Sequence, residues 1–357
     1  MNIGIVIANN TIGGSQRVAM NLSDWLTNKG IETTIISLKR TDKTGYDMQN
    51  YSFVQIESKR IIHSLKKIIK NKNVDCLISM GVPISVYTVP ACFGIKITHI
   101  ISERNDPSHF SGKKITKHLS RFLMSFCDGF VFQTNQAKEF YKKIVKSKPS
   151  VVIYNPLPST FSSNFLTPFS KERKKTIVSV GRLIPQKNHA ILIDTFYNLS
   201  EDFCEYNLII FGEGSERNSL ETKIRELKLD GRVYLPGESN AVFENIYDSS
   251  LFVLSSNYEG LPNSLIEAMA LGLPCISTDC PCGGPRELIQ NGKNGLLVPV
   301  NEPVELEKAV RLLLSDSKKR QMIGNEAAKI KNLLNSDIIS SQWFDFIQKV
   351  YSFRKTK

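Results

Sequence analysis

The stretch LFVLSSNYEGLPNSLIEAMALGLPCISTD, residues 251–279, decides the fold. Two short apolar runs, LFVLSS and PCISTD, flank an apolar helical pattern, SLIEAMALGL, whose start is marked by Pro262. Strand, helix and strand in this order predict a parallel sheet that is covered by helices. In such sheets ligands bind beyond the carboxyl ends of the strands. The loop between the first run and the helix is therefore the first place to look for chemistry.

That loop and helix carry two carboxylates, Glu259 and Glu267. The spacing places Glu259 above the strand and Glu267 about one turn into the helix. The helix N-terminus between them is an anion site, because its N–H groups and dipole favour negative charge. Two acids beside an anion site indicate a ligand with phosphates and hydroxyls, such as a nucleotide sugar. The alternative is a surface glutamate and a second one that only supports the helix.

The strand–helix pattern occurs twice along the chain. Short apolar runs begin with IGIVIA and end with SVVIY in the first half, and TIVSVGR restarts the pattern after a linker at about 155–175. We therefore expect two doubly wound domains in tandem, 1–165 and 171–340, facing each other across a cleft that binds the ligand. The amphipathic segment SDIISSQWFDFIQKVYSFRK supplies a C-terminal helix, assigned to 341–357, that packs back on the first domain.

Charge is distributed unevenly between the halves. The chain has 357 residues and a net charge of +12; residues 1–165 hold 22 Lys/Arg and 10 Asp/Glu, so all of the excess lies there. That half should meet an anionic membrane, a nucleic acid or a phosphorylated substrate. No apolar run reaches the ~18 residues that span a bilayer. The seven scattered cysteines form no framework, which favours reduced thiols in a cytoplasm.

Glycines and cations follow other strands of the second half. Gly181 and Arg182 end a strand and Lys187 follows them; Arg offers a fork for phosphate oxygens and Lys a point charge. The turn FGEG contains Gly212, and near the N-terminus the pair Gly13-Gly14 lies between a strand and a helix. Paired glycines permit close backbone approach to a bound group. Solvated loop cations and plain turns are the alternatives.

At this point a family resemblance is clear. GRLIPQKN, FGEG, EGLPNSLIEAMALGLPCISTD, GGPRELI and NGLLVP stand in the order and spacing of the family 4 retaining glycosyltransferases of GT-B fold, and GGSQRV resembles their GGxERV. The resemblance is specific over 177–300 and looser over 30–150. The pattern from Glu259 to Glu267 is its strongest mark.

The resemblance implies roles for individual residues. Arg182 and Lys187 would hold the donor diphosphate, Glu267 the ribose hydroxyls, and Glu259 the transferred sugar. The implied catalytic residues are thus Glu259, Arg182 and Lys187. Gly14 would let the first domain approach the diphosphate. Further donor contacts are implied at Gly181, Gly212, Gly237, Gly260, Asn263, Ser264 and Leu265.

No metal or other cofactor is expected. The chain contains no Asp-x-Asp, and the two cations with the helix dipole can stabilise the leaving diphosphate. The resemblance implies same-face attack in which the donor phosphate takes the acceptor proton. Many relatives carry His or Asp in the loop that here reads SERNDPSHF, so the acceptor-side candidates are Glu103, Arg104, Asn105 and His109.

Two basic amphipathic segments, 59–73 and 113–126, are predicted as helices of the first half. Such helices either lie on anionic lipid or cover a sheet with a solvated cationic face. We expect a cytoplasmic protein held at the inner face of a bacterial plasma membrane, without nucleic acid. Its expected activity is transfer of a hexose or N-acetylhexosamine from a UDP-sugar to a polyprenyl-diphosphate-linked saccharide in O-antigen or capsule synthesis. The alternatives are a GT-B epimerase or phosphorylase, or a basic nucleic-acid-binding protein.

Overall fold

The chain folds into two compact α/β units, which are described separately. The computed structural model describes residues 1–11, 13–39, 47–109, 114–158, 161, 173–239 and 241–355. Unit 1 comprises Met1–Ser159 and Leu334–Lys357, and unit 2 comprises Thr160–Leu333. Most of the predicted linker lies outside the described residues, and its last two positions already belong to a strand that begins at Lys174.

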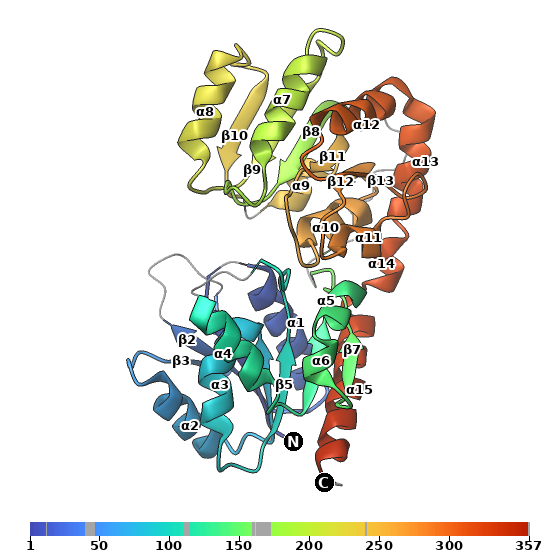
Figure 1. The fold of residues 1–357 in the computed structure, drawn as a ribbon. Coiled ribbons are helices and arrows are strands. Elements are labelled where there is room, and N and C mark those ends of the chain that lie inside the picture. The colour runs from blue at the N-terminus through green and yellow to red at the C-terminus, as the bar shows by residue number, and fades with distance from the viewer. Residues whose placement is uncertain are drawn as a thin grey trace. The chain divides into compact units, whose positions relative to one another are not determined.

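Unit 1 is built on a seven-stranded parallel sheet in the order β3-β2-β1-β4-β5-β6-β7 (Figure 1). The strands are β1 (Ile3–Asn9), β2 (Thr33–Lys39), β3 (Phe53–Gln55), β4 (Cys76–Met80), β5 (Thr98–Ser102), β6 (Gly129–Phe132) and β7 (Ser150–Val152). The central strands are buried on both faces, as expected where helices cover both sides of a parallel sheet.

The helices of unit 1 divide between the two faces of this sheet. α1 (Gly14–Asn28) packs beside α15 (Ser336–Lys355). The other group contains α2 (Ile61–Asn71), η1 (Val82–Ile84), α3 (Ser85–Cys92) and α4 (Lys114–Met124), followed by the short α5 (Asn135–Phe140) and α6 (Lys142–Val145).

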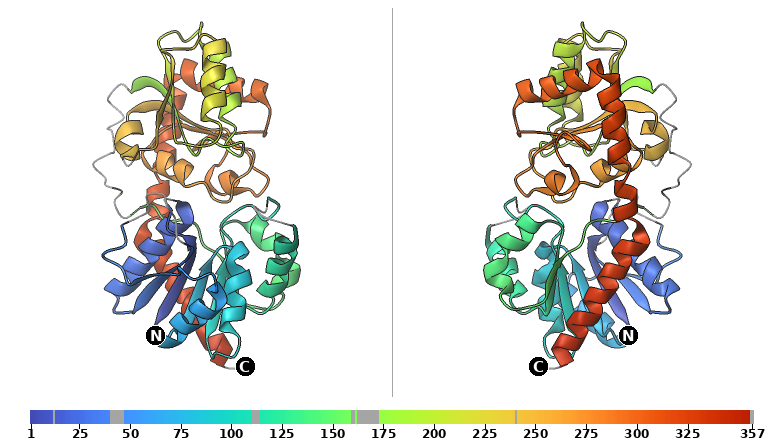
Figure 2. Two further views of the ribbon diagram at one scale, coloured as in Figure 1. Left: turned by 90° about the vertical axis from the view of Figure 1, so that its left-hand side faces the viewer. Right: turned by 90° about the vertical axis from the view of Figure 1, so that its right-hand side faces the viewer.

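The C-terminal helix α15 packs on unit 1, as the sequence predicts, and Figure 2 shows it lying along the sheet. It begins at Ser336, before the boundary assigned at residue 341. Trp343, Phe346, Ile347 and Val350 are buried along one side of the helix. Burial of side chains of this size stabilises by about 1.5–3 kcal/mol each, so α15 is an integral part of unit 1.

Unit 2 contains a six-stranded parallel sheet in the order β10-β9-β8-β11-β12-β13. The strands are β8 (Lys174–Val180), β9 (Asn207–Phe211), β10 (Val233–Gly237), β11 (Ser249–Leu254), β12 (Cys275–Thr278) and β13 (Leu296–Val298). The order reverses between β8 and β11. This is the topological switch point, where loops on neighbouring strands diverge and leave room for a ligand.

The core of unit 2 lies between the sheet and α7 (His189–Leu199), α8 (Arg217–Glu226) and α12 (Pro303–Ser315). Its other helices are α9 (Val242–Ile246), α10 (Asn263–Ala270) and α11 (Gly284–Leu288), with α13 (Ser317–Ala327) and α14 (Ile330–Leu333) near the end of the unit. The sequence predicts one helix from Lys318 to Leu334. It is broken in the structure, although no Gly or Pro stands at the break.

Candidate functional site

The candidate donor site lies at the carboxyl edge of the unit 2 sheet. The loop after β8 carries Gly181, Arg182 and Lys187, and the loop after β11 carries Glu259 and Gly260. β8 and β11 are neighbours at the switch point. The fold therefore brings together two loops that are more than seventy residues apart in the sequence.

Lys187 and Glu259 form an ion pair between these loops. Lys187 Nζ lies 2.5 Å from Glu259 Oε1, and the two side chains are only 13% and 8% exposed. The hydroxyl of Ser256 donates a second hydrogen bond, of 2.6 Å, to the same carboxylate oxygen. Charges withdrawn from water interact strongly only when they are well paired. The pair therefore fixes the position of a cation and an anion at the switch point.

Backbone and side-chain hydrogen bonds join the two loops around this pair. Asn257 N donates to Gln186 O at 2.8 Å, Gln186 Nε2 donates to Tyr258 O at 2.9 Å, and Ser255 Oγ donates to Lys187 O at 3.0 Å. Ser256 and Gln186 were not predicted from the sequence as site residues. Ser256 ends the run LFVLSS, and a polar residue at the end of a buried strand is the signal that would have indicated it.

Two glycine contacts hold neighbouring loops at backbone distance. A Cβ on Gly212 would lie 2.0 Å from Gly181 O, and a Cβ on Gly284 would lie 1.6 Å from Gly260 O. Side chains are excluded at both positions, and Gly212 also has a φ of +143°. Gly212 and Gly284 are thus required by the close packing of their loops against the backbone carbonyls of Gly181 and Gly260.

Glu267 and the start of α10 lie next to this cluster in the chain. α10 begins at Asn263 after Pro262, an N-cap that makes no side-chain hydrogen bond to the helix. Asn263, Ser264 and Leu265 form its first turn. Glu267 follows in the second turn and is 6% exposed. The loop and helix positions predicted for Glu259 and Glu267 are those observed.

Arg182 and Gly237 occupy more open positions. Arg182 is exposed, and within the part of the chain that the structure describes its side chain makes no ion pair. Gly237 ends β10 with a φ of +94°, and its carbonyl accepts a 2.8 Å hydrogen bond from Gly212 N. The guanidinium of Arg182 is thus available to a ligand, whereas the ammonium of Lys187 is already paired.

The acceptor-side candidates lie in unit 1, in the loop after β5. Glu103 is buried; its Oε1 accepts from the backbone N–H groups of Arg104 and Asn105 at 2.9 and 3.2 Å, and its Oε2 accepts from Tyr141 at 2.8 Å. Burial raises the pKa of Glu103, an effect that these hydrogen bonds reduce. The buried carboxylate of Glu103 therefore fixes the backbone of this loop through its hydrogen bonds, while Asn105 is exposed.

Arg104 is buried with an unsatisfied guanidinium. Its Nη1 is 3.4 Å from Ser102 Oγ, and neither its Nε nor its Nη2, both shielded from solvent, finds a hydrogen-bond partner among the residues that the structure describes. Burial lowers its pKa to about 10, which leaves it cationic at neutral pH. A buried donor without an acceptor costs about 1–3 kcal/mol, and more when it is charged. An anionic ligand would supply the missing acceptors.

His109 lies at the end of the same loop. Its Nδ1 is 3.0 Å from Asp106 Oδ2 and 2.9 Å from Ser108 Oγ, and its side chain is 44% exposed. The contact with the Asp106 carboxylate fixes the orientation of the imidazole ring. The structure thus groups all four acceptor-side candidates in one loop. Gly14 also lies in unit 1, as the first residue of α1.

Over the residues placed by the structure, no three His, Cys, Asp or Glu side chains cluster as a metal site would require. In the same part of the chain, no helix has the length and apolar character needed to cross a bilayer.

Comparison with known proteins gives matches over both halves. The model of the family described as Glycosyltransferase Family 4 matches residues 12–160, and the model described as Glycosyl transferases group 1 matches residues 164–330. An uncharacterized glycosyltransferase of Haemophilus influenzae is 27% identical over 96% of this chain and 97% of its own length.

Two other relatives have more informative names. A Campylobacter jejuni GalNAc-α-(1→4)-GalNAc-α-(1→3)-diNAcBac-PP-undecaprenol α-1,4-N-acetyl-D-galactosaminyltransferase is 27% identical over 98% of this chain and 99% of its own length. The crystal structure of Anabaena HepE in complex with UDP aligns with a TM-score of 0.82 at 17% identity, over 98% of this chain and 100% of that one. The fold, the two family models that together match most of the chain, and the full-length relatives agree: the chain belongs to the family 4 glycosyltransferases and has the GT-B fold.

Proposed function

We propose that this glycosyltransferase moves a hexose or N-acetylhexosamine from a UDP-sugar to a saccharide carried on a polyprenyl diphosphate, with retention of configuration and without a metal. The product would be a repeat unit of a bacterial surface polysaccharide, such as O-antigen or capsule. The observation that carries the proposal is the Lys187–Glu259 pair at the switch point of unit 2, beside the start of α10.

Each donor group meets a residue of matching chemistry in this proposal. The diphosphate would bind Lys187, Arg182 and the first turn of α10, where cations and a helix N-terminus can stabilise the charge that develops on the leaving group. Glu259 would contact hydroxyls of the transferred sugar, and Glu267 those of the ribose. The acceptor hydroxyl would attack from the face that the diphosphate leaves, and a diphosphate oxygen would take its proton.

The acceptor side is supported by Arg104. Two unsatisfied guanidinium nitrogens, buried in a loop with Glu103 and His109, suit a phosphate oxygen of a lipid diphosphate. The C. jejuni relative, whose name describes an undecaprenyl-diphosphate-linked trisaccharide as its acceptor, supports the same substrate class. HepE, solved with UDP, supports the choice of nucleotide.

The test has a binding part and a transfer part. Calorimetry should show UDP binding that Lys187→Ala abolishes and Lys223→Ala preserves, because Lys223 pairs with Asp194 on an exposed surface of unit 2. Incubation of the protein with a panel of UDP- and GDP-sugars and polyprenyl-diphosphate-linked acceptors, with and without EDTA, should give one product that is resolved by mass.

Two results would contradict the proposal. Unchanged UDP affinity in Lys187→Ala would remove the diphosphate role of this lysine. A strict requirement for manganese would show that the cations and helix of unit 2 do not suffice for leaving-group stabilisation.

A further inference from the structure

Unit 1 carries a row of exposed apolar side chains on α4, which we call the α4 stripe. Ile115, Leu119, Phe122 and Phe126 are 74%, 47%, 63% and 51% exposed. Their spacing of four, three and four places them on one side of the helix and its C-terminal turn. Phe93, 48% exposed, extends the stripe, because its ring lies 5.7 Å from that of Phe126, which in turn lies 5.4 Å from Phe122.

The α4 stripe does not pack against the sheet of unit 1. Ser120, Leu123 and Met124 of α4 are the residues that are buried against the unit. In α2, by contrast, Leu65 and Ile69 are buried in the core and Ile61 packs against it. Of the two basic amphipathic helices, α2 thus covers the sheet in the ordinary way, whereas α4 buries Leu123 and Met124 and leaves the stripe exposed.

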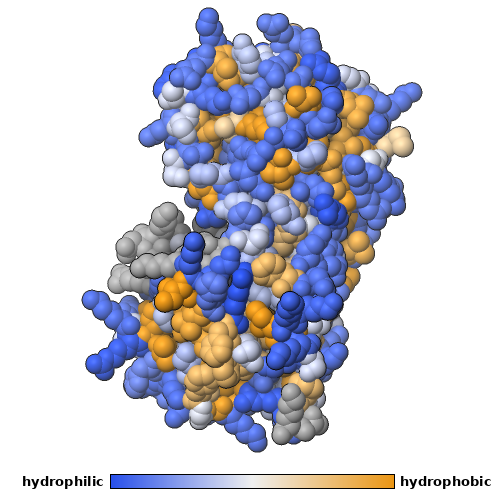
Figure 3. Space-filling model, in the orientation of Figure 1, coloured by the Kyte–Doolittle hydropathy of each residue, from blue (hydrophilic) through white to orange (hydrophobic). Residues whose placement is uncertain are grey.

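Such a surface indicates a binding partner. Single exposed apolar residues are common, but contiguous groups of large ones mark interaction sites. Figure 3 shows hydrophobic side chains gathered on the unit 1 face where Figure 1 places α4. Removing apolar side chains from water favours binding in proportion to the area that is covered, so five of them can support substantial binding.

The charge around the stripe indicates which partner. Residues 58–127 contain twelve Lys/Arg and three Asp/Glu. Of the three acids, Glu103 and Asp106 are buried and Asp75 lies 3.9 Å from the N-terminal ammonium. Lys114, Lys117 and Arg121 lie along one side of α4, and Lys66 Nζ donates to Phe93 O at 2.6 Å. Apolar residues beside cations match the acyl boundary and anionic headgroups of a bilayer.

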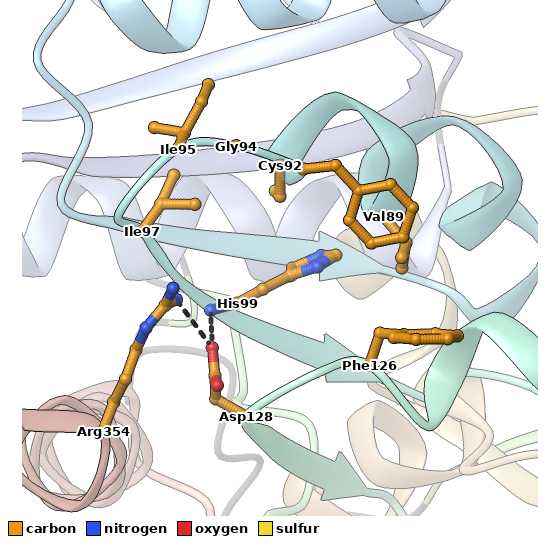
Figure 4. A pocket seen from close by; sticks show the side chains of 10 residues that line it. Val89, Cys92, Gly94, Ile95, Ile97, His99, Phe126, Asp128 and Arg354 are labelled. Atoms are coloured by element: carbon orange, nitrogen blue, oxygen red, sulfur yellow. Dashed lines mark hydrogen bonds and ion pairs between the residues drawn. The ribbon is translucent and has the colours of Figure 1, made fainter. Parts of the chain in front are cut away.

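A pocket of about 200 Å³ continues the stripe into unit 1 (Figure 4). Phe93 and Phe126 line it together with Val89, Ile95 and Ile97. Its polar lining carries little net charge, because Asp128 pairs with Arg354 at 3.0 Å and burial lowers the pKa of His99 to about 4. The carboxylate of Asp128, the one acidic group among its lining residues, is thus neutralised by Arg354 and does not repel a lipid.

α4 is also tied to the acceptor-side loop. Arg121 Nη2 donates to Pro107 O at 3.0 Å, and Lys117 Nζ donates to Ser108 O at 3.3 Å. These bonds join the helix that carries the stripe to the loop that carries Arg104 and His109. A lipid-linked acceptor would thus meet its binding loop at the surface that holds its lipid.

We propose that the α4 stripe inserts into the headgroup–acyl boundary of an anionic bilayer, with the cations of unit 1 contacting the headgroups. The significance for a lipid-linked acceptor rests on the proposed function, but the insertion itself does not.

The test is flotation of the full-length protein with vesicles. The protein should bind vesicles of phosphatidylcholine with 30% phosphatidylglycerol better than vesicles of phosphatidylcholine alone. Leu119→Ser/Phe122→Ser should weaken binding to the anionic vesicles roughly tenfold or more. Val304→Ser/Met322→Ser is the matched control, because it removes two residues of unit 2 that are 58% and 68% exposed, and it should bind like the wild type.

A second readout locates the stripe in the bilayer. Tryptophan emission of Phe122→Trp should shift to the blue with anionic vesicles and be quenched by lipids brominated on the acyl chain. UDP affinity, measured on the same variants, should not change, which separates this proposal from that for the donor site.

Three outcomes would overturn the inference: no vesicle binding by the wild type, equal binding by the Leu119→Ser/Phe122→Ser variant, or a wild-type dimer in light scattering that this variant converts to a monomer. The last would assign the stripe to a contact between two copies of the chain.

Discussion

Lys187 and Glu259 illustrate how one pair can serve both stability and binding. In the structure the carboxylate neutralises the ammonium, so the diphosphate of the proposed donor would compete with Glu259 for Lys187. The sequence indicated both residues through their family motifs. It could not indicate that they contact each other, because that contact depends on two loops meeting across β8 and β11.

Glu259→Gln should therefore separate binding from transfer. Without the carboxylate, Lys187 is free for phosphate, and UDP affinity should stay equal or rise up to about fivefold, the value of a modest ion pair. Transfer should fall by roughly 100-fold, because a group that contacts the reacting sugar is lost. Calorimetry and product formation measure the two effects. Asp194→Asn, which removes the acid of an exposed pair at 2.6 Å, should change neither.

Weaker UDP binding by Glu259→Gln would contradict this account. It would show that the paired form of Lys187, rather than the released one, binds the nucleotide.

Arg104 gives a second prediction at the residue scale. Because two of its guanidinium nitrogens are buried without acceptors, Arg104→Met should raise the free energy of unfolding by about 1 kcal/mol. The same change should raise KM for the lipid-linked acceptor at least tenfold and leave UDP affinity unaltered. Urea unfolding and steady-state kinetics are the measurements, with the exposed Arg60→Met of unit 1 as control. A destabilised Arg104→Met with normal KM would assign the guanidinium to the fold alone.

At the scale of elements, the sequence predicted the strands well. IGIVIA and SVVIY form β1 and β7, LFVLSS and PCISTD form β11 and β12, and SLIEAMALGL forms most of α10. Strongly periodic or continuous apolar segments carry their own signal. The outward face of α4 and the break between α13 and α14 depend on tertiary packing, and amphipathicity alone gives no sign of which way a helix faces.

The loop contact at Gly284 can be tested at this scale. A methyl group there would lie 1.6 Å from Gly260 O, so the loops after β11 and β12 would have to separate. Gly284→Ala should cost about 2 kcal/mol of stability and weaken UDP binding at least tenfold. Gly295→Ala is the comparison, because its methyl group meets only the side chain of Ile289 at 3.0 Å and should cost less. Equal effects in the two variants would argue against a special role for the loop contact.

At the scale of the whole molecule, each unit holds one buried histidine that favours the neutral form. Burial lowers the pKa of His99 in unit 1 to about 4, and burial together with Lys187 lowers that of His189 in unit 2 to about 4. Both are at most 3% exposed. Both halves of the chain should therefore respond to acid.

The sign follows from the lowered pKa values. In the unfolded chain these histidines bind protons below about pH 6.5, whereas in the folded protein they bind them only near pH 4. The free energy of unfolding should therefore fall as the pH drops from 7 toward 4, by about 2 kcal/mol per histidine at pH 5. Urea unfolding at pH 7 and pH 5 measures the loss, and His99→Gln and His189→Gln should each remove part of it. A pH-independent free energy of unfolding over this range would contradict the prediction.

The chain leaves unit 1 after Ser159 and returns at Leu334, and the two crossings lie side by side there: Leu157 N donates to Leu334 O at 2.8 Å, and Asn21 Nδ2 contacts Leu157 O at 3.4 Å. Unit 2 is therefore inserted between two segments of unit 1, and unit 1 is complete only when the chain on both sides of the insertion is present. If the proposed function holds, an exchange of residues 160–333 between relatives should change the donor sugar and leave the acceptor unchanged. A protein truncated near the middle of the chain would instead lack α15, whose residues Trp343 and Ile347 are buried in unit 1.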